Sequence, residues 1–174
     1  MSRRAFAITV LAAMLATAAS ADAIDPCSLL SDAERVELGV PSDSVPSRES
    51  QPGGVQACKY RFRTPGAASA GMVAIILSQA VPERVLQLRG LQAKAREEGT
   101  PAQQRARGEY FEGKAMCKVV LASQQENSQC VDASEQSVVA LTVSRPNLGN
   151  EVTYPASQLR IVAALASRVT SRGG

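Results

Sequence analysis

Four cysteines and the absence of histidine limit the chemistry that this chain can perform. The cysteines are Cys27, Cys58, Cys117 and Cys130, and the sequence contains no histidine. Without an imidazole, Ser-His-Asp and Cys-His nucleophilic sites are excluded. The chain also lacks a Cys-x-x-Cys pair, a glycine-rich phosphate loop and a dinucleotide fingerprint. We therefore expect no metal site and no cofactor.

An even number of cysteines in an exported chain predicts two disulfides. Three pairings are formally open. We favour Cys27–Cys58 and Cys117–Cys130, because each bond closes a local loop. Sulfurs held in structural bonds within strands are not reactive thiolates, so a redox role is disfavoured.

The remaining route to an enzyme uses paired carboxylates or a Ser-Lys pair. Asp132 and Glu135 are close in sequence, and two carboxylates can hydrolyse glycosidic bonds. No spacing marks a Ser-Lys pair for acyl transfer. A solvated turn between two strands accounts for Asp132 and Glu135 equally well. A carboxylate-dependent hydrolase is therefore kept as an alternative, and we expect the protein not to be an enzyme.

One row of cations is a candidate binding surface. Residues 58–63 alternate, so Lys59, Arg61 and Arg63 share one face of a strand, opposite Cys58 and its apolar neighbours. This basic row could meet an anionic envelope component or another envelope protein. Its alternative role is to keep an exposed sheet edge from pairing with other chains.

The N-terminus has the pattern of a signal peptide. Arg3 and Arg4 precede an apolar segment, and Ala19-Ser20-Ala21 is a small-x-small cleavage site. The two arginines leave secretory and twin-arginine export both open. The apolar segment is shorter than the roughly 20 residues that a helix needs to span a bilayer. We expect a signal peptide over 1–21, a single extracytoplasmic domain over 22–174, and a periplasmic or secreted location.

Cleavage near Ala21 leaves 153 residues and lowers the basic count from 19 to 17, against 16 acidic residues. A mature chain so close to neutrality has no charge signature for nucleic acid. We expect no nucleic-acid partner and no membrane span.

The mature chain opens on Asp25-Pro26-Cys27-Ser28-Leu29-Leu30, followed by Ser31-Asp32-Ala33-Glu34. Ser31 and Glu34 form a capping-box pattern. Gly39 and Pro41 end the segment. We predict a helix over 32–38 with Leu30, Ala33 and Val36 facing inward.

With a second cysteine beside an aromatic (Cys58-Lys59-Tyr60), this opening resembles a family of secreted domains of unknown function, typical of actinobacterial cell-envelope lipoproteins. The chain departs from that family in having Tyr60 where tryptophan is usual, and no lipidation context before Cys27. The resemblance implies an α+β extracytoplasmic domain and no known activity.

Periodicity places the other elements. We predict a surface loop over 40–56, strands over 58–63 and 72–77, and a polar linker over 102–107. A helix starts at Pro82 and ends near Gly99, with its inner stripe formed by Val81, Val85, Leu88, Leu91 and Ala95.

The second half reads as strands over 109–111, 115–122, 130–132 and 138–143, with a polar turn over 123–129. Pairing of 115–122 with the next strand would bring Cys117 opposite Cys130. The last helix starts at Pro155, with Leu159, Val162, Ala166 and Val169 inward.

These elements predict an α+β fold: an antiparallel sheet of five to six strands, about three helices packed on it, and two disulfides. We expect an exported, non-catalytic envelope domain with a binding or structural role. Alternatives are a carrier of small apolar ligands or lipids, and the hydrolase.

Overall fold

The computed structural model of the protein describes residues 24–63, 70–122, 125–135, 137–146 and 154–172. In chain order, the elements are a 3-10 helix η1 (Pro26–Ser28), α1 (Asp32–Glu37), β1 (Ser47–Gln51), β2 (Val55–Arg63), β3 (Ala70–Gln79), α2 (Pro82–Glu97), α3 (Pro101–Ala106), β4 (Glu109–Glu112), β5 (Ala115–Ala122), β6 (Gln125–Ala133), β7 (Ser137–Pro146) and α4 (Ala156–Arg172). The predicted signal peptide lies outside the described residues.

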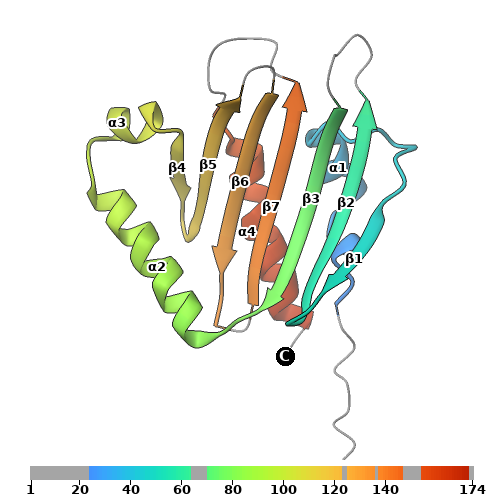
Figure 1. The fold of residues 1–174 in the computed structure, drawn as a ribbon, viewed down its shortest axis with the longest axis horizontal. Coiled ribbons are helices and arrows are strands. Elements are labelled where there is room, and N and C mark those ends of the chain that lie inside the picture. The colour runs from blue at the N-terminus through green and yellow to red at the C-terminus, as the bar shows by residue number, and fades with distance from the viewer. Residues whose placement is uncertain (1–23, 64–69, 123–124, 136, 147–153, 173–174) are drawn as a thin grey trace, which may run out of the picture.

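The strands form one seven-stranded antiparallel sheet in the order β1-β2-β3-β7-β6-β5-β4 (Figure 1). The predicted α+β class is confirmed, with more strands than the five to six expected. The two halves of the chain join where β3 pairs with β7, with Ile75 opposite Leu141. This long-range pair places β1 and β2 toward one edge of the sheet and the β4–β5 hairpin at the other edge.

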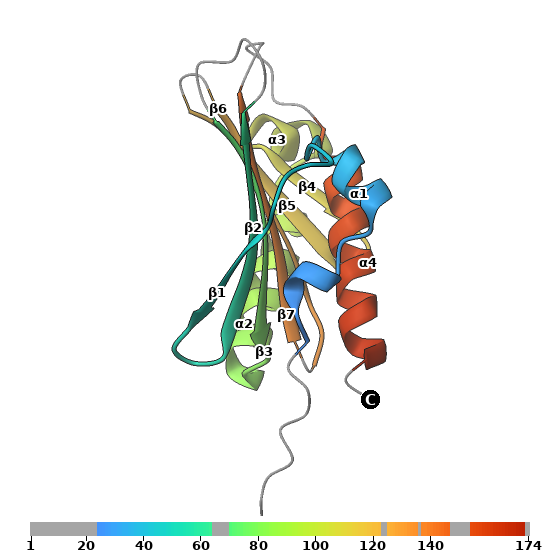
Figure 2. The same cartoon turned by 90° about the vertical axis from the view of Figure 1, so that its right-hand side faces the viewer.

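Helices α1 and α4 lie on the same side of the sheet (Figure 2). Helix α4 contacts β5, β6 and β7, and η1 contacts β2 and β3. The predicted stripe of α4 is confirmed, because each of its residues is buried between helix and sheet. The most completely buried side chains of this core include Tyr60, Val73, Ile75, Val139, Leu141, Leu159 and Leu165.

Helix α1 has the predicted cap. The backbone N–H of Glu34 donates to the Ser31 hydroxyl (3.3 Å), and the Ser31 N–H donates to the Glu34 carboxylate (2.9 Å). Ala33 and Val36 were wrongly placed on the inner face, since both are exposed, Val36 by 68%. Instead, Leu29 and Leu30, just before the helix, enter the core.

Three segments that the sequence analysis predicted to be irregular contain a strand or a helix. The 40–56 loop contains β1, whose residues are polar and largely exposed, so no alternation marks them. The 102–107 linker contains most of α3, which is capped by Thr100 and Gln103. Strand β6 begins at Gln125, inside the predicted 123–129 turn, because pairing with β5 and β7 extends the strand beyond its apolar part.

Both predicted disulfides are present. Cys27–Cys58 ties η1 to β2, and Cys117–Cys130 joins two residues that lie opposite each other on β5 and β6. Disulfides persist mainly in oxidising compartments, which indicates an extracytoplasmic location. Among the helices of the described ranges, none has the length and apolarity needed to cross a bilayer.

Candidate functional site

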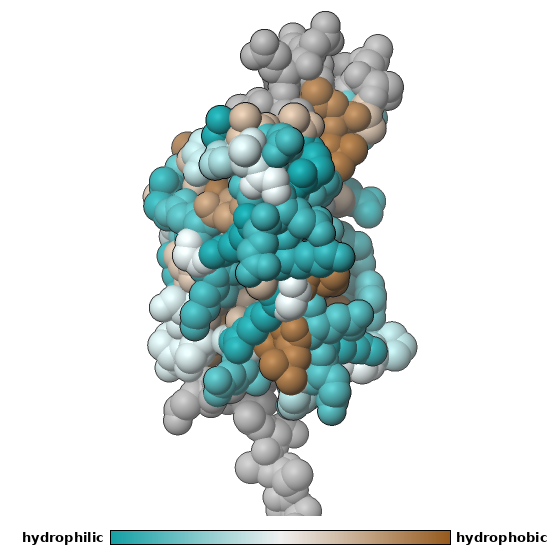
Figure 3. All heavy atoms as spheres, turned by 90° about the vertical axis from the view of Figure 1, so that its left-hand side faces the viewer, coloured by the Kyte–Doolittle hydropathy of each residue, from teal (hydrophilic) through white to brown (hydrophobic). Residues whose placement is uncertain are grey.

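Helix α2 buries one apolar and one polar side chain and leaves two of its leucines in solvent. Val85 and Gln92 are its buried residues, whereas Leu86 and Leu91 are 68% and 59% exposed. The predicted apolar stripe is therefore confirmed at Val85 and wrong at Val81 and Leu91, which are both exposed. The face seen from the left of Figure 1, where α2 lies, is mainly hydrophilic with separate hydrophobic patches (Figure 3).

The polar inner face of α2 leaves an open cleft of about 380 Å3 against the β4–β5 turn and the end of β6. We call this the α2 cleft. It is lined by Arg89, Gln92, Ala93, Arg96, Gly113, Lys114, Ala133 and Glu135.

The two arginines of the α2 cleft are held by backbone carbonyls rather than by carboxylates. Nη2 of Arg89 donates to the carbonyl of Ala133 (3.3 Å), and Nη2 of Arg96 donates to that of Gly113. A guanidinium carries five N–H donors, so one such bond leaves others for a ligand. Within the described ranges, the ion pairs involve neither arginine, nor Lys114 of the same cleft.

Gln92 lies between these arginines on one helical face, at i+3 from Arg89 and i−4 from Arg96. The residue is only 7% exposed, and its Nε2 is buried without a hydrogen-bond partner among the described residues. A buried donor left unpaired costs about 1–3 kcal/mol. Because Gln92 lines the α2 cleft, this unpaired donor marks the cleft as the candidate binding site.

Asp132 and Glu135, the predicted carboxylate pair, lie close to this cleft but in different environments. Asp132 lies in β6 and is only 8% exposed, so its predicted position in a solvated turn is wrong. Burial raises the pKa of Asp132, while the nearby charges of Lys114 and Arg89 oppose that rise. Glu135 is exposed at the rim of the cleft.

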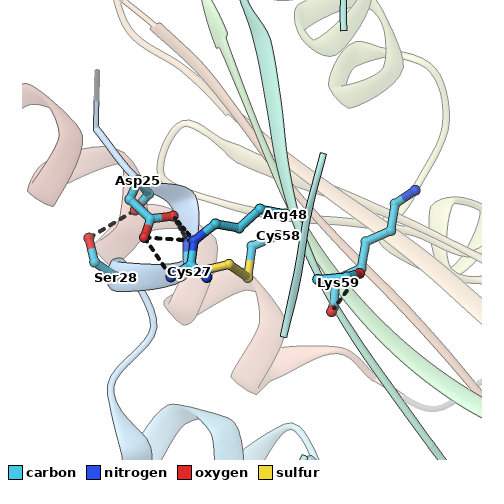
Figure 4. Close-up of a disulfide and its surroundings, with 7 residues drawn as sticks. Asp25, Cys27, Ser28, Arg48, Cys58 and Lys59 are labelled. Atoms are coloured by element: carbon cyan, nitrogen blue, oxygen red, sulfur yellow. Dashed lines mark hydrogen bonds and ion pairs between the residues drawn. A yellow bond between two sulfur atoms is a disulfide. The ribbon is translucent and has the colours of Figure 1, made fainter. Parts of the chain in front are cut away.

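The basic row lies elsewhere. Lys59 leaves β2 on the side opposite Cys58 (Figure 4), and its Nζ pairs with Glu49 of β1 (2.5 Å). Strand β1 reaches along β2 as far as Lys59, which pairs with Ser47, so this part of β2 is not a sheet edge. Arg61 and Arg63 are exposed beyond it.

The Cys27–Cys58 disulfide, next to this row, is flanked by hydrogen bonds to Asp25. Asp25 accepts hydrogen bonds from the Cys27 backbone (2.9 Å) and from the Arg48 guanidinium (2.9 and 3.1 Å) (Figure 4). The bond from Arg48 is the main reason that the pKa of Asp25 is lowered. This arrangement fixes η1 against β1 and β2 and is structural.

The sequence analysis missed Arg89, Gln92, Arg96 and Lys114. Their signal is present, because residues 89, 92 and 96 follow a helical i, i+3, i+7 spacing. A polar stripe of this kind normally faces solvent, and only the packing of α2 shows that it faces the sheet.

No family model matches the chain, and no curated protein does. One solved structure, ginseng major latex-like protein 151 from Panax ginseng, is similar at 11% identity over 87% of this chain and 91% of that chain. The TM-score is 0.24, and a likeness at this level carries no conclusion about fold or function.

Proposed function

We propose that this protein is an exported, non-catalytic domain that binds an anionic ligand, a carboxylate or phosphate, in the α2 cleft. The predicted leader over 1–21, with cleavage near Ala21, and the two disulfides support export. An anionic component of the cell envelope is the corresponding partner. The cleft takes the role that the sequence analysis gave to the basic row.

The observation that carries this proposal is the buried, unpartnered Nε2 of Gln92 between two arginines that have no carboxylate partner in the described ranges. Charge-assisted hydrogen bonds from arginine to carboxylate or phosphate are among the strongest in proteins. A ligand oxygen would accept from Gln92 and meet the free guanidinium donors at the same time.

The composition of the α2 cleft favours binding over the two alternatives. Its charged lining is unlike the apolar wall of a lipid carrier. The cysteine sulfurs are all in disulfides and the chain has no histidine, which supports a non-catalytic role.

Amide NMR titration with acetate and with inorganic phosphate tests the site. We expect shifts in α2 and at Gly113 and Lys114, with affinity reduced roughly tenfold in Gln92→Leu because one charge-assisted bond is lost. The same substitution should not lower the free energy of unfolding, since it removes an unsatisfied buried donor.

A charge-matched pair of variants separates the two basic surfaces. Arg89→Ala/Arg96→Ala should abolish the shifts, whereas Arg61→Ala/Arg63→Ala removes the same charge and should leave them unchanged. Shifts that follow Arg61 and Arg63 instead would show that the basic row is the site and the proposal is wrong.

A further inference from the structure

Strand β4 is one of the two edges of the sheet, and a groove of about 500 Å3 lies beside it (Figure 1). We call this the β4 groove. Its walls come from β4, from α3, which contacts β4, and from the residue before Pro155. The lining residues are Pro101, Gln104, Arg105, Glu109, Tyr110, Phe111 and Tyr154.

The backbone of β4 points alternately toward β5 and away from the sheet. The carbonyl of Gly108, just before β4, accepts from the N–H of Val119 in β5 (2.8 Å). Because backbone groups alternate along a paired antiparallel strand, those of Tyr110 also face β5, and those of Glu109 and Phe111 face away from it. Within the described ranges, β4 pairs with β5 alone, and no hydrogen bond reaches the outward backbone groups of Glu109 and Phe111. Two N–H and two C=O groups are therefore open at this edge.

The side chains of β4 give the groove two different faces. Consecutive residues of a strand point to opposite faces, so Tyr110, which lies opposite the buried Cys117, is on the core side and Phe111 is on the other side. On the core side, the ring of Tyr154 lies 5.3 Å from that of Tyr110 and is 56% exposed. On the other side, the guanidinium of Arg96 lies 5.1 Å from the ring centre of Phe111. A strand added to β4 would present alternate side chains to these two faces.

The α3 wall of the groove is already held in place. Nε2 of Gln104 donates to the carbonyl of Arg96 (2.8 Å), which joins α3 to α2. Arg107, at the end of α3, donates to the carbonyl of Glu98 (2.8 Å) and to the carboxylate of Glu109 (2.8 Å). A wall fixed before binding reduces the entropy that a ligand must offset.

The charge of the β4 groove favours an acidic ligand. Burial raises the pKa of Tyr110, and the nearby charge of Arg105 opposes that rise. Among the ion pairs of the described ranges, none involves Arg105. The carboxylate of the groove, Glu109, is already paired with Arg107 (2.8 Å) and Lys118 (3.0 Å). Acidic side chains of a partner would therefore meet an unpaired cation.

We propose that the β4 groove binds an extended acidic segment of a partner protein, which adds to the sheet as an antiparallel strand beside β4. Main-chain hydrogen bonds to Glu109 and Phe111 give affinity in this mode, and the side chains of alternate residues give specificity. An aromatic residue of the segment packs against Tyr154, and acidic residues meet Arg105. Exposed edges are normally protected by charged residues or proline, whereas the middle of β4 is aromatic. The proposal does not depend on the anion site in the α2 cleft.

A capped peptide, EEVYVEE, tests the proposal by calorimetry and amide NMR. With its tyrosine opposite Tyr110, the two valines lie opposite Glu109 and Phe111, and the second and sixth glutamates share the face of Arg105. We expect binding, with slower hydrogen exchange at the amides of Glu109 and Phe111, because both become hydrogen-bonded.

Methylated peptides separate main-chain from side-chain recognition. N-methylation of both valines removes the donors that face β4 and should weaken binding at least tenfold. N-methylation of the tyrosine, whose N–H faces away from β4, is the matched control and should have little effect. The charge-reversed peptide KKVYVKK should bind at least tenfold more weakly than EEVYVEE.

Substitutions in the protein test the two anchors. Tyr154→Ala and Arg105→Ala should each weaken EEVYVEE about tenfold. Arg61→Ala removes the same charge from β2 and should leave binding unchanged. Gln92→Leu, in the α2 cleft, should also leave it unchanged. The thermal midpoint of each variant shows that it remains folded.

Each failure has its own signature. Equal binding of the valine-methylated peptide, or unchanged exchange at Glu109 and Phe111, overturns strand addition. Binding of KKVYVKK as tight as that of EEVYVEE overturns the acidic partner, and a loss of peptide binding in Gln92→Leu moves the peptide to the α2 cleft. No binding of EEVYVEE at about 1 mM overturns the inference entirely. Binding of acetate and phosphate in the α2 cleft is measured separately, so the proposed function stands or falls by itself.

Discussion

Helices α4 and α2 have nearly equal lengths, 17 and 16 residues, and opposite relations to the sheet. Helix α4 buries an apolar stripe in the core, whereas α2 buries only Val85 and Gln92 and exposes Leu86 and Leu91. Arg89 and Arg96 of α2 line the α2 cleft. The first arrangement excludes water, and the second leaves a cleft. A helix that leaves apolar surface in water while burying an unsatisfied amide is not optimised for stability, and such departures concentrate at functional sites.

The ion pairs follow the same division. On the α4 side, Arg168 forms a double contact with the Glu34 carboxylate (2.7 Å for both bonds) and also donates to the carbonyl of Leu29 (2.7 Å). On the α2 side, Arg89 and Arg96 contact carbonyls. Arg168 and Glu34 on the α4 side therefore form an ion pair within the fold, whereas Arg89 and Arg96 take part in none of the ion pairs of the described ranges.

Truncating one leucine on each helix gives the largest expected contrast. Leu165 on α4 is fully buried, so Leu165→Ala should lower the free energy of unfolding by about 2–5 kcal/mol through lost burial and a cavity. Leu91→Ala on α2 should stay within about 0.5 kcal/mol. Urea unfolding with the disulfides intact measures both. Equal losses would remove the distinction between the helices.

Removing the arginine that links α1 to α4 tests the matched charges. Arg168→Ala should lower the free energy of unfolding by about 1–3 kcal/mol, because the Leu29 carbonyl and the Glu34 carboxylate both lose the hydrogen bonds that Arg168 donates. Arg160→Ala, which breaks the more exposed pair with Glu37, is the control and should cost much less. Thermal and urea unfolding of both variants decide the order, and a larger loss for Arg160→Ala would contradict it.

The smallest effects concern two carboxyl groups with opposite pKa shifts. Burial disfavours charge on Glu34, but bonds from Arg168 and Ser31 outweigh it and lower the pKa of Glu34 below its ordinary 4.5. Glu34 therefore stabilises the fold above pH 4.5, and this contribution is lost as the pH falls toward the folded-state pKa. Glu34→Gln should be less stable than wild type at pH 7, and the difference should narrow on acidification.

The pKa of Asp132 shifts in the opposite direction to that of Glu34. Burial raises its pKa above the ordinary 3.8, so its charge is disfavoured in the folded state at neutral pH. The fold is relatively stabilised below pH 3.8, and that stability is lost as the pH rises through the folded-state pKa. Asp132→Asn should therefore raise the thermal midpoint at pH 7, and the gain should vanish below pH 3.8. A gain that persists in acid would rule out this cause.

The sequence predicted those elements whose apolar periodicity matches the residues that they bury. Strand β5 matches the predicted 115–122, and α4 has its predicted stripe, because strong apolar periodicity at these places agrees with the tertiary packing. The polar residues of β1 and the short α3 have no such pattern. Strand β1 forms because β2 offers a ladder of backbone partners, and this ladder is visible only in the assembled sheet.

The candidate site was harder to predict than the fold. Asp132 and Glu135 were noticed as carboxylates, but the arginines and Gln92 that define the α2 cleft read as an ordinary solvated helical face. Clustering of the few aromatic residues was equally hidden, since Tyr110 and Tyr154 are 44 positions apart and meet only because β4 lies near the start of α4.

By itself, the sequence determined the disulfide-linked α+β class, since cysteine count, local spacing and apolar periodicity are properties of the chain. Only the tertiary structure decided which face of α2 meets the sheet. A hydrophobic stripe directs its own burial, because water drives it inward, whereas a polar stripe takes its surroundings from the packing of everything else.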